Sequence, residues 1–157
     1  MVVDATSNKV VSVLDKSGSC AILALFVDDM CYIANIGDCR AVIFSSNGEG
    51  ARDLSTDHTP ANPHEEQRIK DAGGYTQQKP DSGVVRVYPG GLSCTRSFGD
   101  ATAKCQETYG NPDVVTAVPE IEELRINSEH DFIVMACDGI YDRLSSKEVV
   151  EAVRQGT

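Results

Sequence analysis

Two carboxylates follow directly on apolar runs of the sequence. Asp38 ends the run Y-I-A-N-I-G-D, and Asp138 ends the run F-I-V-M-A-C-D. An unpaired carboxylate inside a core is costly, so each of them needs a cation, hydrogen-bond donors or a place at the rim. Asp142 lies four residues after Asp138 and faces the same point if the chain curls there. Oxygen ligands of this kind suit magnesium, manganese or calcium better than zinc.

The glycines beside these acids support two interpretations. Gly37 and Gly139 let the backbone turn sharply where a ligand approaches. However, an Asp next to a Gly at a strand end is also a common turn former, and for either acid taken singly this plain role is favoured. Spacing alone therefore leaves both a cation site and a pair of structural turns open.

The other polar residues of interest are better interpreted as structural groups than as functional ones. His58 precedes the turn-rich segment T-P-A-N-P, and we favour a loop-fixing role over that of a general base. Arg96 and Asp100 are expected to form an internal ion pair, with anion binding as the alternative. Cys39 and Cys137 adjoin the two acids. Because a nearby negative charge raises the pKa of a thiol, neither cysteine is a good nucleophile candidate.

Composition excludes several classes of protein. The chain has 157 residues and a formal charge of −10 at pH 7, from 24 acidic and 14 basic side chains. A protein that binds the phosphate backbone normally carries a basic excess, so no nucleic-acid partner is expected. The longest uninterrupted apolar run, Ala21–Val27, is far shorter than the roughly 20 residues of a membrane-spanning helix, so no membrane partner is expected either.

Cysteine usage favours a reducing compartment. Four of the six cysteines lie inside or beside apolar runs, and none has C-x-x-C spacing, which argues against zinc. Reduced, mostly buried thiols are therefore expected, in a cytoplasmic or nuclear protein. The six are Cys20, Cys31, Cys39, Cys94, Cys105 and Cys137.

Apolar runs predict the strands that must position these residues. Ser19–Val27 and Met30–Phe44 are separated only by Asp28-Asp29, which predicts a hairpin turn. Their near-continuous apolarity predicts strands covered on both faces. Further strands are expected at Val84–Tyr88, Val114–Val118 and Ile121–Ile126, with a strongly buried one at Phe132–Cys137.

Two helices have readable ends. Asn62 can cap the first, Glu65 occupies the capping-box position, and Gly73-Gly74 stop it. Ser145 and Glu148 form the corresponding pair at the start of the second. Between the helices, the polar stretch from Tyr75 to Gly91 predicts an exposed loop or flap, and Ala101 to Asp113 is expected to be irregular. The pattern is that of one α+β domain, with helices packed outside antiparallel sheets.

Four segments, taken together and in order, resemble the metal-dependent (type 2C, PPM) serine/threonine protein phosphatases. The first combines S-G-S-C-A with Y-I-A-N-I-G-D-C-R-A-V-I, and the second is L-S-T-D-H-T-P-A-N-P-H-E-E-Q-R-I-K-D-A-G-G. The third is G-G-L-S-C-T-R-S-F-G-D, and the fourth is F-I-V-M-A-C-D-G-I-Y-D-R-L-S-S-K-E-V-V. The resemblance covers nearly everything from Ser17 to Arg154.

The resemblance implies a fold, an activity and site residues. The fold is a partial sandwich of two antiparallel sheets flanked by helices, and the activity is hydrolysis of phosphoserine and phosphothreonine in proteins with magnesium or manganese. Asp138 matches the core metal ligand, while Asp38 and Asp142 match acids of an additional, weaker metal site. Gly73-Gly74 through Phe98, which includes Arg96, corresponds to the flap that influences substrate choice.

The sequence also departs from the family pattern. Motifs that the family carries upstream (an Arg for the phosphate, a Glu-Asp pair and Asp-Gly-His) and a later Asp-Asn motif do not occur, so one of four core acidic ligands remains. We therefore expect residues 1–157 to form a single, incomplete domain, with an irregular segment over 1–16, exposed apolar faces and little or no catalysis. The partner would be a phosphoprotein substrate or, in the alternative of a non-catalytic pseudophosphatase or interaction module, a bound protein.

Overall fold

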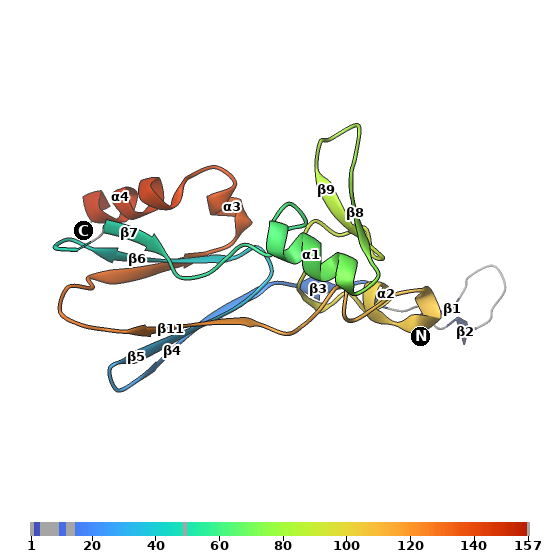
Figure 1. Ribbon diagram of the computed structural model, residues 1–157, viewed down its shortest axis with the longest axis horizontal. Helices are drawn as coiled ribbons and strands as arrows, with labels where there is room; N and C mark the ends of the chain where they lie inside the picture. Colours follow the sequence, from blue (N-terminus) through green and yellow to red (C-terminus); the bar gives the residue numbers. More distant parts are fainter. Residues whose placement is uncertain (1, 4–9, 12–14, 49, 157) are drawn as a thin grey trace.

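Two three-stranded antiparallel sheets form the larger half of the molecule (Figure 1). The computed structural model describes residues 2–3, 10–11, 15–48 and 50–156. One sheet has the order β11-β5-β4, formed by Glu120–Arg125, Met30–Ile36 and Ala21–Val27. The other has the order β12-β6-β7, formed by Phe132–Ala136, Arg40–Ser45 and Gly50–Asp53.

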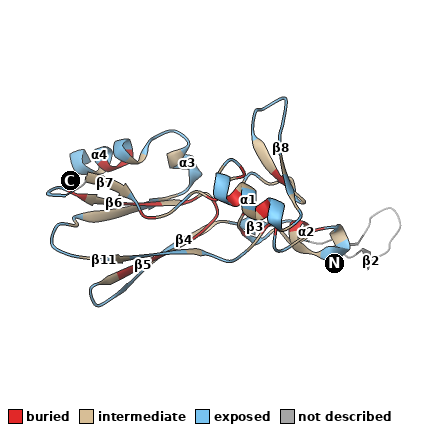
Figure 2. Cartoon of the chain, viewed as in Figure 1, coloured by how far each residue is buried: buried red, intermediate tan, exposed pale blue. Residues whose placement is uncertain are grey.

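A shared hydrophobic cluster joins the two sheets. Cys31 and Ile33 of β5 pack with Ala41 and Ile43 of β6 and with Leu54, and all five are buried. Figure 2 shows buried residues along β5 and β6, between which this cluster lies. The predicted α+β sandwich of two antiparallel sheets is therefore confirmed.

The first hairpin forms where the sequence predicts it, but its burial differs. β4 and β5 pair antiparallel with Val27 opposite Met30, and Asp28 adopts a positive φ of 52° in the turn. β4 is not covered on both faces, because Leu23, Leu25 and Phe26 are each more than half exposed. β4 is an edge strand of a three-stranded sheet, and continuous apolarity in a sequence does not say which covering layers are present.

A helix flanks the second sheet, as predicted. α4 (Ser146–Gly156) contacts β6 and β7 on the second sheet. Its capping box is confirmed: the Ser145 hydroxyl lies 2.7 Å from a Glu148 carboxylate oxygen, which also accepts the Ser145 N–H at 2.8 Å. No helix in the described part of the chain combines the length and the apolar character that a membrane crossing requires.

The other helix with readable ends, α1 (Pro63–Asp71), starts as predicted. The Asn62 side chain accepts the His64 N–H at 2.9 Å. The capping-box role of Glu65 is wrong, because its carboxylate turns inward and binds arginine side chains instead. Shorter helical segments are α2 (Ala101–Lys104), η1 (Gln106–Thr108) and α3 (Asp138–Tyr141).

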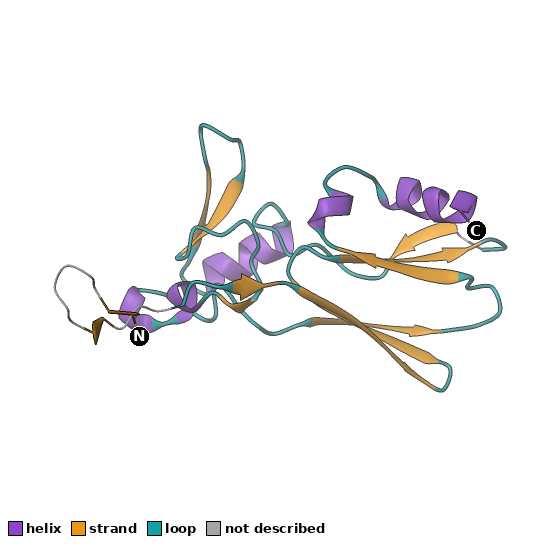
Figure 3. Ribbon diagram, turned by 180° about the vertical axis from the view of Figure 1, so that it is seen from behind, coloured by secondary structure: helices purple, strands orange, loops and turns teal. Residues whose placement is uncertain are grey.

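A second hairpin projects from the smaller half of the molecule (Figures 1 and 3). β8 (Tyr75–Gln78) pairs with β9 (Val85–Tyr88), which confirms an exposed flap and its one predicted strand. β8 was not predicted because its sequence Y-T-Q-Q is polar. A second buried cluster lies below the flap and contains Ile69, Val87, Ala103, Val114 and Val115.

Two strand predictions need correction. Val114–Val118 is not a strand. Val114 and Val115 are buried in the second cluster, and their N–H groups bond to the Asn111 carbonyl. The segment makes one isolated bridge, between Thr116 and Arg96. Phe132–Cys137 does contain β12, but none of the residues of that strand is fully buried. Both errors arise because apolar composition measures burial propensity and not the hydrogen-bond pattern or the covering layers.

Short pairings complete the chain. β3 (Gly18–Ser19) pairs with β10 (Phe98–Gly99), which brings the start of the first hairpin beside the strand that returns from the flap. The irregular segment expected over 1–16 lies largely outside the described residues, but β1 (Val2–Val3) and β2 (Val10–Val11) pair antiparallel within it.

Candidate metal-binding pocket

The three predicted metal ligands line one pocket. Asp38, Asp138 and Asp142 lie around a space of about 540 Å³, which is also lined by the tip of the flap and by Thr59–Ala61. These acids come from segments 100 residues apart in the sequence. The structure thus brings the predicted site residues together, whatever their role.

Strand register explains this convergence. β6 pairs antiparallel with β12, and Arg40 lies opposite Ala136 at one end of the ladder. Asp38 precedes β6 by two residues and Asp138 follows β12 by two, so both emerge at the same edge of the sheet. Asp142 closes the single turn of α3, where its N–H bonds to the Asp138 carbonyl at 2.8 Å.

A buried asparagine fixes the turn that carries Asp38. The Asn35 amide donates to the carbonyl oxygens of Gly37, Cys39 and Thr56 at 3.2, 3.0 and 3.0 Å. Burying an amide is costly unless it is hydrogen-bonded, so these contacts specify one conformation of the turn. Asn35 was not among the predicted site residues, although a lone polar residue inside an apolar strand is a usable signal.

One cation shares the pocket with the three acids. Arg86, on β9 of the flap, lines it, and its Nη1 donates to the Gly91 carbonyl at 3.0 Å. The Nε of Arg86 is buried and has no hydrogen-bond partner among the described residues. Nothing in the sequence distinguished Arg86 from the other arginines, because its role depends on how the hairpin folds back.

The oxygen atoms of the acidic pocket are ligands of the type that a hard cation prefers, but they do not form a complete ligand set. Carboxylate oxygens are the ligands that magnesium and manganese prefer. Within residues 15–48 and 50–156, however, no three His, Cys, Asp or Glu side chains are grouped closely enough to hold a metal ion. The pocket can therefore supply some ligands to a hydrated cation, with waters or further groups completing its coordination.

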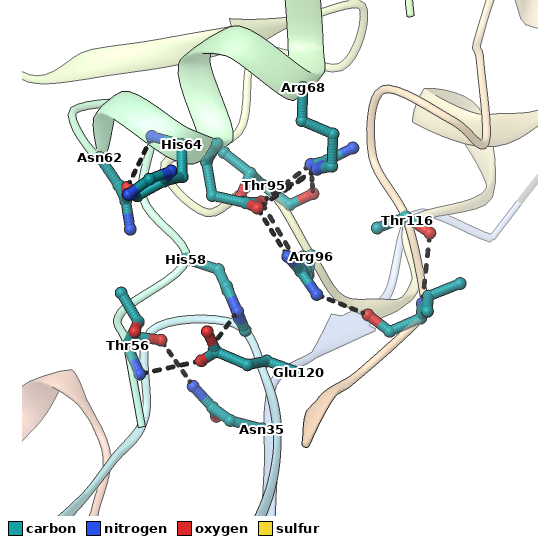
Figure 4. A network of polar contacts seen from close by, with 12 residues as sticks. Asn35, Thr56, His58, Asn62, His64, Arg68, Thr95, Arg96, Thr116 and Glu120 are labelled. Carbon is teal, nitrogen blue, oxygen red and sulfur yellow. Dashed lines mark hydrogen bonds and ion pairs between the residues drawn. The ribbon is translucent and has the colours of Figure 1, made fainter. Parts of the chain in front are cut away.

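Arg96, predicted as part of the flap and substrate region, lies outside this pocket. Its guanidinium binds Glu65 at 2.7 Å and the Val118 carbonyl at 3.1 Å (Figure 4). The ion pair expected between Arg96 and Asp100 is therefore replaced by one with Glu65. Burial acts to raise the pKa of the Glu65 carboxyl, but hydrogen bonds from Arg96, Arg68 and Thr95 outweigh it and hold that pKa well below its ordinary value.

Gly73 and Gly74 shape the entry to the flap. Gly73 has a φ of +82°, a left-handed conformation that ends α1 and favours glycine. A Cβ on Gly74 would lie 2.7 Å from a Val114 methyl carbon and 2.8 Å from the Tyr88 carbonyl oxygen. Neither glycine lines the pocket. Gly73 and Gly74 instead help to position the β8–β9 hairpin.

His58 has the loop-fixing role favoured from the sequence. It is buried, its Nδ1 accepts the Gly37 N–H at 3.2 Å, and its carbonyl accepts the Thr95 N–H at 2.8 Å. Burial and the nearby Arg96 charge lower the pKa of His58. His58 thus holds the Asp38 turn through its imidazole and the segment that returns from the flap through its main-chain carbonyl.

The cysteines are less buried than predicted. All six thiols are free, but only Cys31 and Cys39 are buried and Cys137 is exposed, so the prediction of mostly buried thiols is wrong. Burial, together with the charges of Asp38 and Asp138, raises the pKa of Cys39 to about 11. A raised pKa leaves little thiolate, in line with the expectation that Cys39 is a poor nucleophile.

Solved structures share this fold. A serine-threonine phosphatase 2C from Toxoplasma gondii matches 88% of the chain with a TM-score of 0.72 and 24% identity, over 46% of that protein. A sex-determining protein from C. elegans matches 89% of the chain with a TM-score of 0.75 and 27% identity, over 32% of that protein. These likenesses support the fold class.

Sequence comparison supports the family. "Probable protein phosphatase 2C 2" of Arabidopsis thaliana is 39% identical over 139 residues, which are 88% of this chain and 33% of that protein. Human "Protein phosphatase 1B" is 37% identical over 143 residues, 90% of this chain and 28% of that protein. The chain thus spans about a third of the length of these curated relatives. The sequence profile described as "Protein phosphatase 2C" matches residues 2–157, so the chain belongs to the protein phosphatase 2C family.

Proposed function

We propose that this chain supplies the flap and one acidic edge of the active site of a metal-dependent protein serine/threonine phosphatase, and that the chain alone has little or no activity. The observation that carries the proposal is that Asp38, Asp138 and Asp142 line the same pocket as residues of the flap. Family membership supports the reaction class, and the departures from the family pattern support the lack of independent turnover.

The chemistry follows from the kinds of group in the pocket. Asp38, Asp138 and Asp142 would contribute oxygen ligands to magnesium or manganese. When bound, such ions lower the pKa of a coordinated water and offset charge on phosphoryl oxygens. Arg86 offers a guanidinium on the flap side of the same pocket, where it would hold the phosphoryl group of a phosphoserine or phosphothreonine by charge-assisted hydrogen bonds.

A phosphatase assay tests the proposal. The purified chain is incubated with p-nitrophenyl phosphate, and separately with phosphoserine and phosphothreonine peptides, in millimolar manganese. We expect release of phosphate at the level of a blank without protein, because the described residues do not close a ligand set around a metal ion. Manganese-dependent turnover that Asp138→Asn removes would overturn the proposed incompetence and leave the reaction class standing.

The same observation favours a second candidate from another class. A scaffold with an intact pocket and flap but an open ligand set could bind a phosphorylated protein without hydrolysing it, as a pseudophosphatase does. Fluorescence anisotropy with a labelled phosphoserine peptide separates the two. Binding that needs phosphate on the peptide and is weakened by Arg86→Ala, without any turnover, would favour the interaction module.

A further inference from the structure

One arginine lies behind the acidic pocket and joins segments that surround it. Arg40, the first residue of β6, donates two hydrogen bonds to the Asp57 carboxylate, from Nε at 2.9 Å and from Nη2 at 2.7 Å. Its remaining nitrogen, Nη1, donates to the Ser146 hydroxyl oxygen at the start of α4, at 3.1 Å. The guanidinium carbon lies 4.7 Å from the centre of the Tyr141 ring in α3. All three nitrogens are therefore engaged while the group lies over an aromatic ring.

The contact with Tyr141 anchors the short helix that carries the pocket acids. α3 contains Asp138 and is followed directly by Asp142. Asp138, Gly139 and Ile140 are exposed, and Tyr141 is the one residue of α3 that is partly buried. A single helical turn is unstable by itself, because its nucleation fixes several residues for one hydrogen bond. The position of α3 therefore depends on the contact that its aromatic ring makes with Arg40.

The same guanidinium is linked to two other parts of the pocket wall. Asp57, which it binds in a bidentate manner, precedes residues 59–61, and these line the pocket. His58, the next residue after Asp57, holds the Asp38 turn. Arg40 does not line the pocket itself, so it can act on a ligand only through these neighbours.

Charge explains why the pocket needs such an anchor. Carboxylates that face one space repel one another, so their convergence has to be maintained by contacts outside the pocket. From the contacts of its guanidinium we propose that Arg40, acting through Tyr141, is a positioning residue that keeps Asp138 and Asp142 directed at the space that Asp38 lines. A lysine cannot replace it, because a single ammonium lacks the planar fork that binds Asp57. The consequence for metal binding rests on the proposed function, whereas the position of α3 does not.

Hydrogen exchange of the full chain, measured by mass spectrometry, tests the position of α3 without any metal. The N–H groups of Asp142, Arg143 and Leu144 bond to carbonyl oxygens of α3. In Arg40→Lys and in Tyr141→Leu, we expect these amides to exchange about two- to fivefold faster, the range that loss of one cation–π contact allows. The amides of β5, in the other sheet, should keep their wild-type rates. An equal acceleration in β5 would indicate a general loss of stability and would overturn the proposal.

Two control variants separate positioning from packing. Tyr141→Phe keeps the ring that Arg40 contacts, and the Tyr141 hydroxyl has no hydrogen-bond partner among the described residues, so α3 should exchange as in the wild type. Arg68→Lys is the matched control for loss of a guanidinium. The Arg68 side chain is 27% exposed against 22% for Arg40, and it binds Glu65, which does not line the pocket. Unchanged α3 exchange in Arg40→Lys, or equally fast exchange in either control, would contradict the role of Arg40. Tyr141→Leu decides the question if Arg40→Lys does not fold.

Manganese binding provides a separate readout of the same variants. Replacement of a group that orients metal ligands typically weakens metal affinity by about tenfold or more. At a manganese concentration about ten times the wild-type dissociation constant, the rise in melting temperature should fall to about a third in Arg40→Lys and Tyr141→Leu, and should be retained in Tyr141→Phe. A wild type without any rise would contradict the proposed metal site, while the exchange rates would still decide whether Arg40 positions α3. A rise of wild-type size in both Arg40→Lys and Tyr141→Leu would overturn the role of Arg40 toward the metal ligands.

Discussion

The Glu65 carboxylate on the first turn of α1 binds the Arg96 guanidinium on the segment that returns from the flap, with 2.7 Å between Oε1 and Nη2. The two side chains are only 4% and 16% exposed. The same carboxylate binds Arg68 at 2.9 Å and accepts the Thr95 hydroxyl. One buried acid therefore joins α1 to the segment that carries Cys94 and leads into β10.

Glu65→Gln should destabilise the chain strongly. Removal of one partner of a largely buried ion pair leaves Arg96 without compensation, and we expect a loss of about 2–4 kcal/mol in the free energy of unfolding. Urea denaturation followed by circular dichroism measures it. Glu66→Gln is the matched control, because Glu66 pairs with Lys70 on the half-exposed side of α1 and should cost about 0.5 kcal/mol or less. Equal losses in the two variants would contradict a special role of the Glu65–Arg96 pair.

His58 should make stability depend on pH. Its folded-state pKa lies below the ordinary value of 6.5, so the unfolded chain binds more protons there and the free energy of unfolding falls as the pH drops below 6.5. The contribution of neutral His58 to stability is fully present above pH 6.5. Below that pH, the free energy of unfolding should change by at most about 1.4 kcal/mol per pH unit, because one proton is involved. Urea unfolding should be measured between about pH 5.5 and 7.5, because ordinary carboxyl groups titrate below this pH range and do not contribute to the slope.

The variant that tests this assignment is His58→Gln. It should be less stable at pH 7.5, because the Gly37 N–H loses its imidazole partner, and should show a shallower pH slope than the wild type. His64→Gln, on the exposed surface of α1, should keep the wild-type slope. A slope unchanged in His58→Gln would place the titration elsewhere.

The two faces of the first sheet should respond differently to truncation. Ile33 is 1% exposed at the centre of the cluster between the sheets, and Ile33→Ala should cost about 2–5 kcal/mol. Leu25 on β4 is 52% exposed, and Leu25→Ala should cost about 1 kcal/mol or less. Thermal unfolding of both variants checks this. A large loss for Leu25→Ala would mean that the outer face of β4 is covered in solution, for example by a second copy of the chain.

Sequence reasoning succeeded where local chemistry decides structure. The Asp28-Asp29 turn, the Asn62 cap and the Ser145–Glu148 box depend on neighbouring residues, and all three form. Strand register was enough to place Asp38 and Asp138 at one edge once the sheet was known.

The failures concern contacts between distant segments. Glu65 satisfies the local rule for a capping box, but Arg96 and Thr95, about 30 residues further along the chain, offer its carboxylate stronger partners. The place of Arg86 in the pocket likewise depends on how the flap folds back, which no local pattern encodes. Exposure of β4 could not be read from its composition, because burial depends on the layers packed against a strand.

Residual metal binding is the prediction that bears most directly on the acidic pocket. Carboxylates of this pocket would supply part of the ligand set of a divalent ion that keeps several waters, so we expect an affinity toward the weak, millimolar end of the range for oxygen ligands. At ten times such a dissociation constant, binding to the folded state adds about 1.4 kcal/mol, which raises the melting temperature by about 3–5 °C. Differential scanning fluorimetry in 10 mM manganese should detect that rise. Asp38→Ala and Asp138→Ala should abolish it, whereas Glu107→Ala, an equal change of charge at an exposed site outside the pocket, should retain it. An equal rise in all four proteins would mean general screening of the −10 charge, and Asp38 and Asp138 would then be plain turn formers.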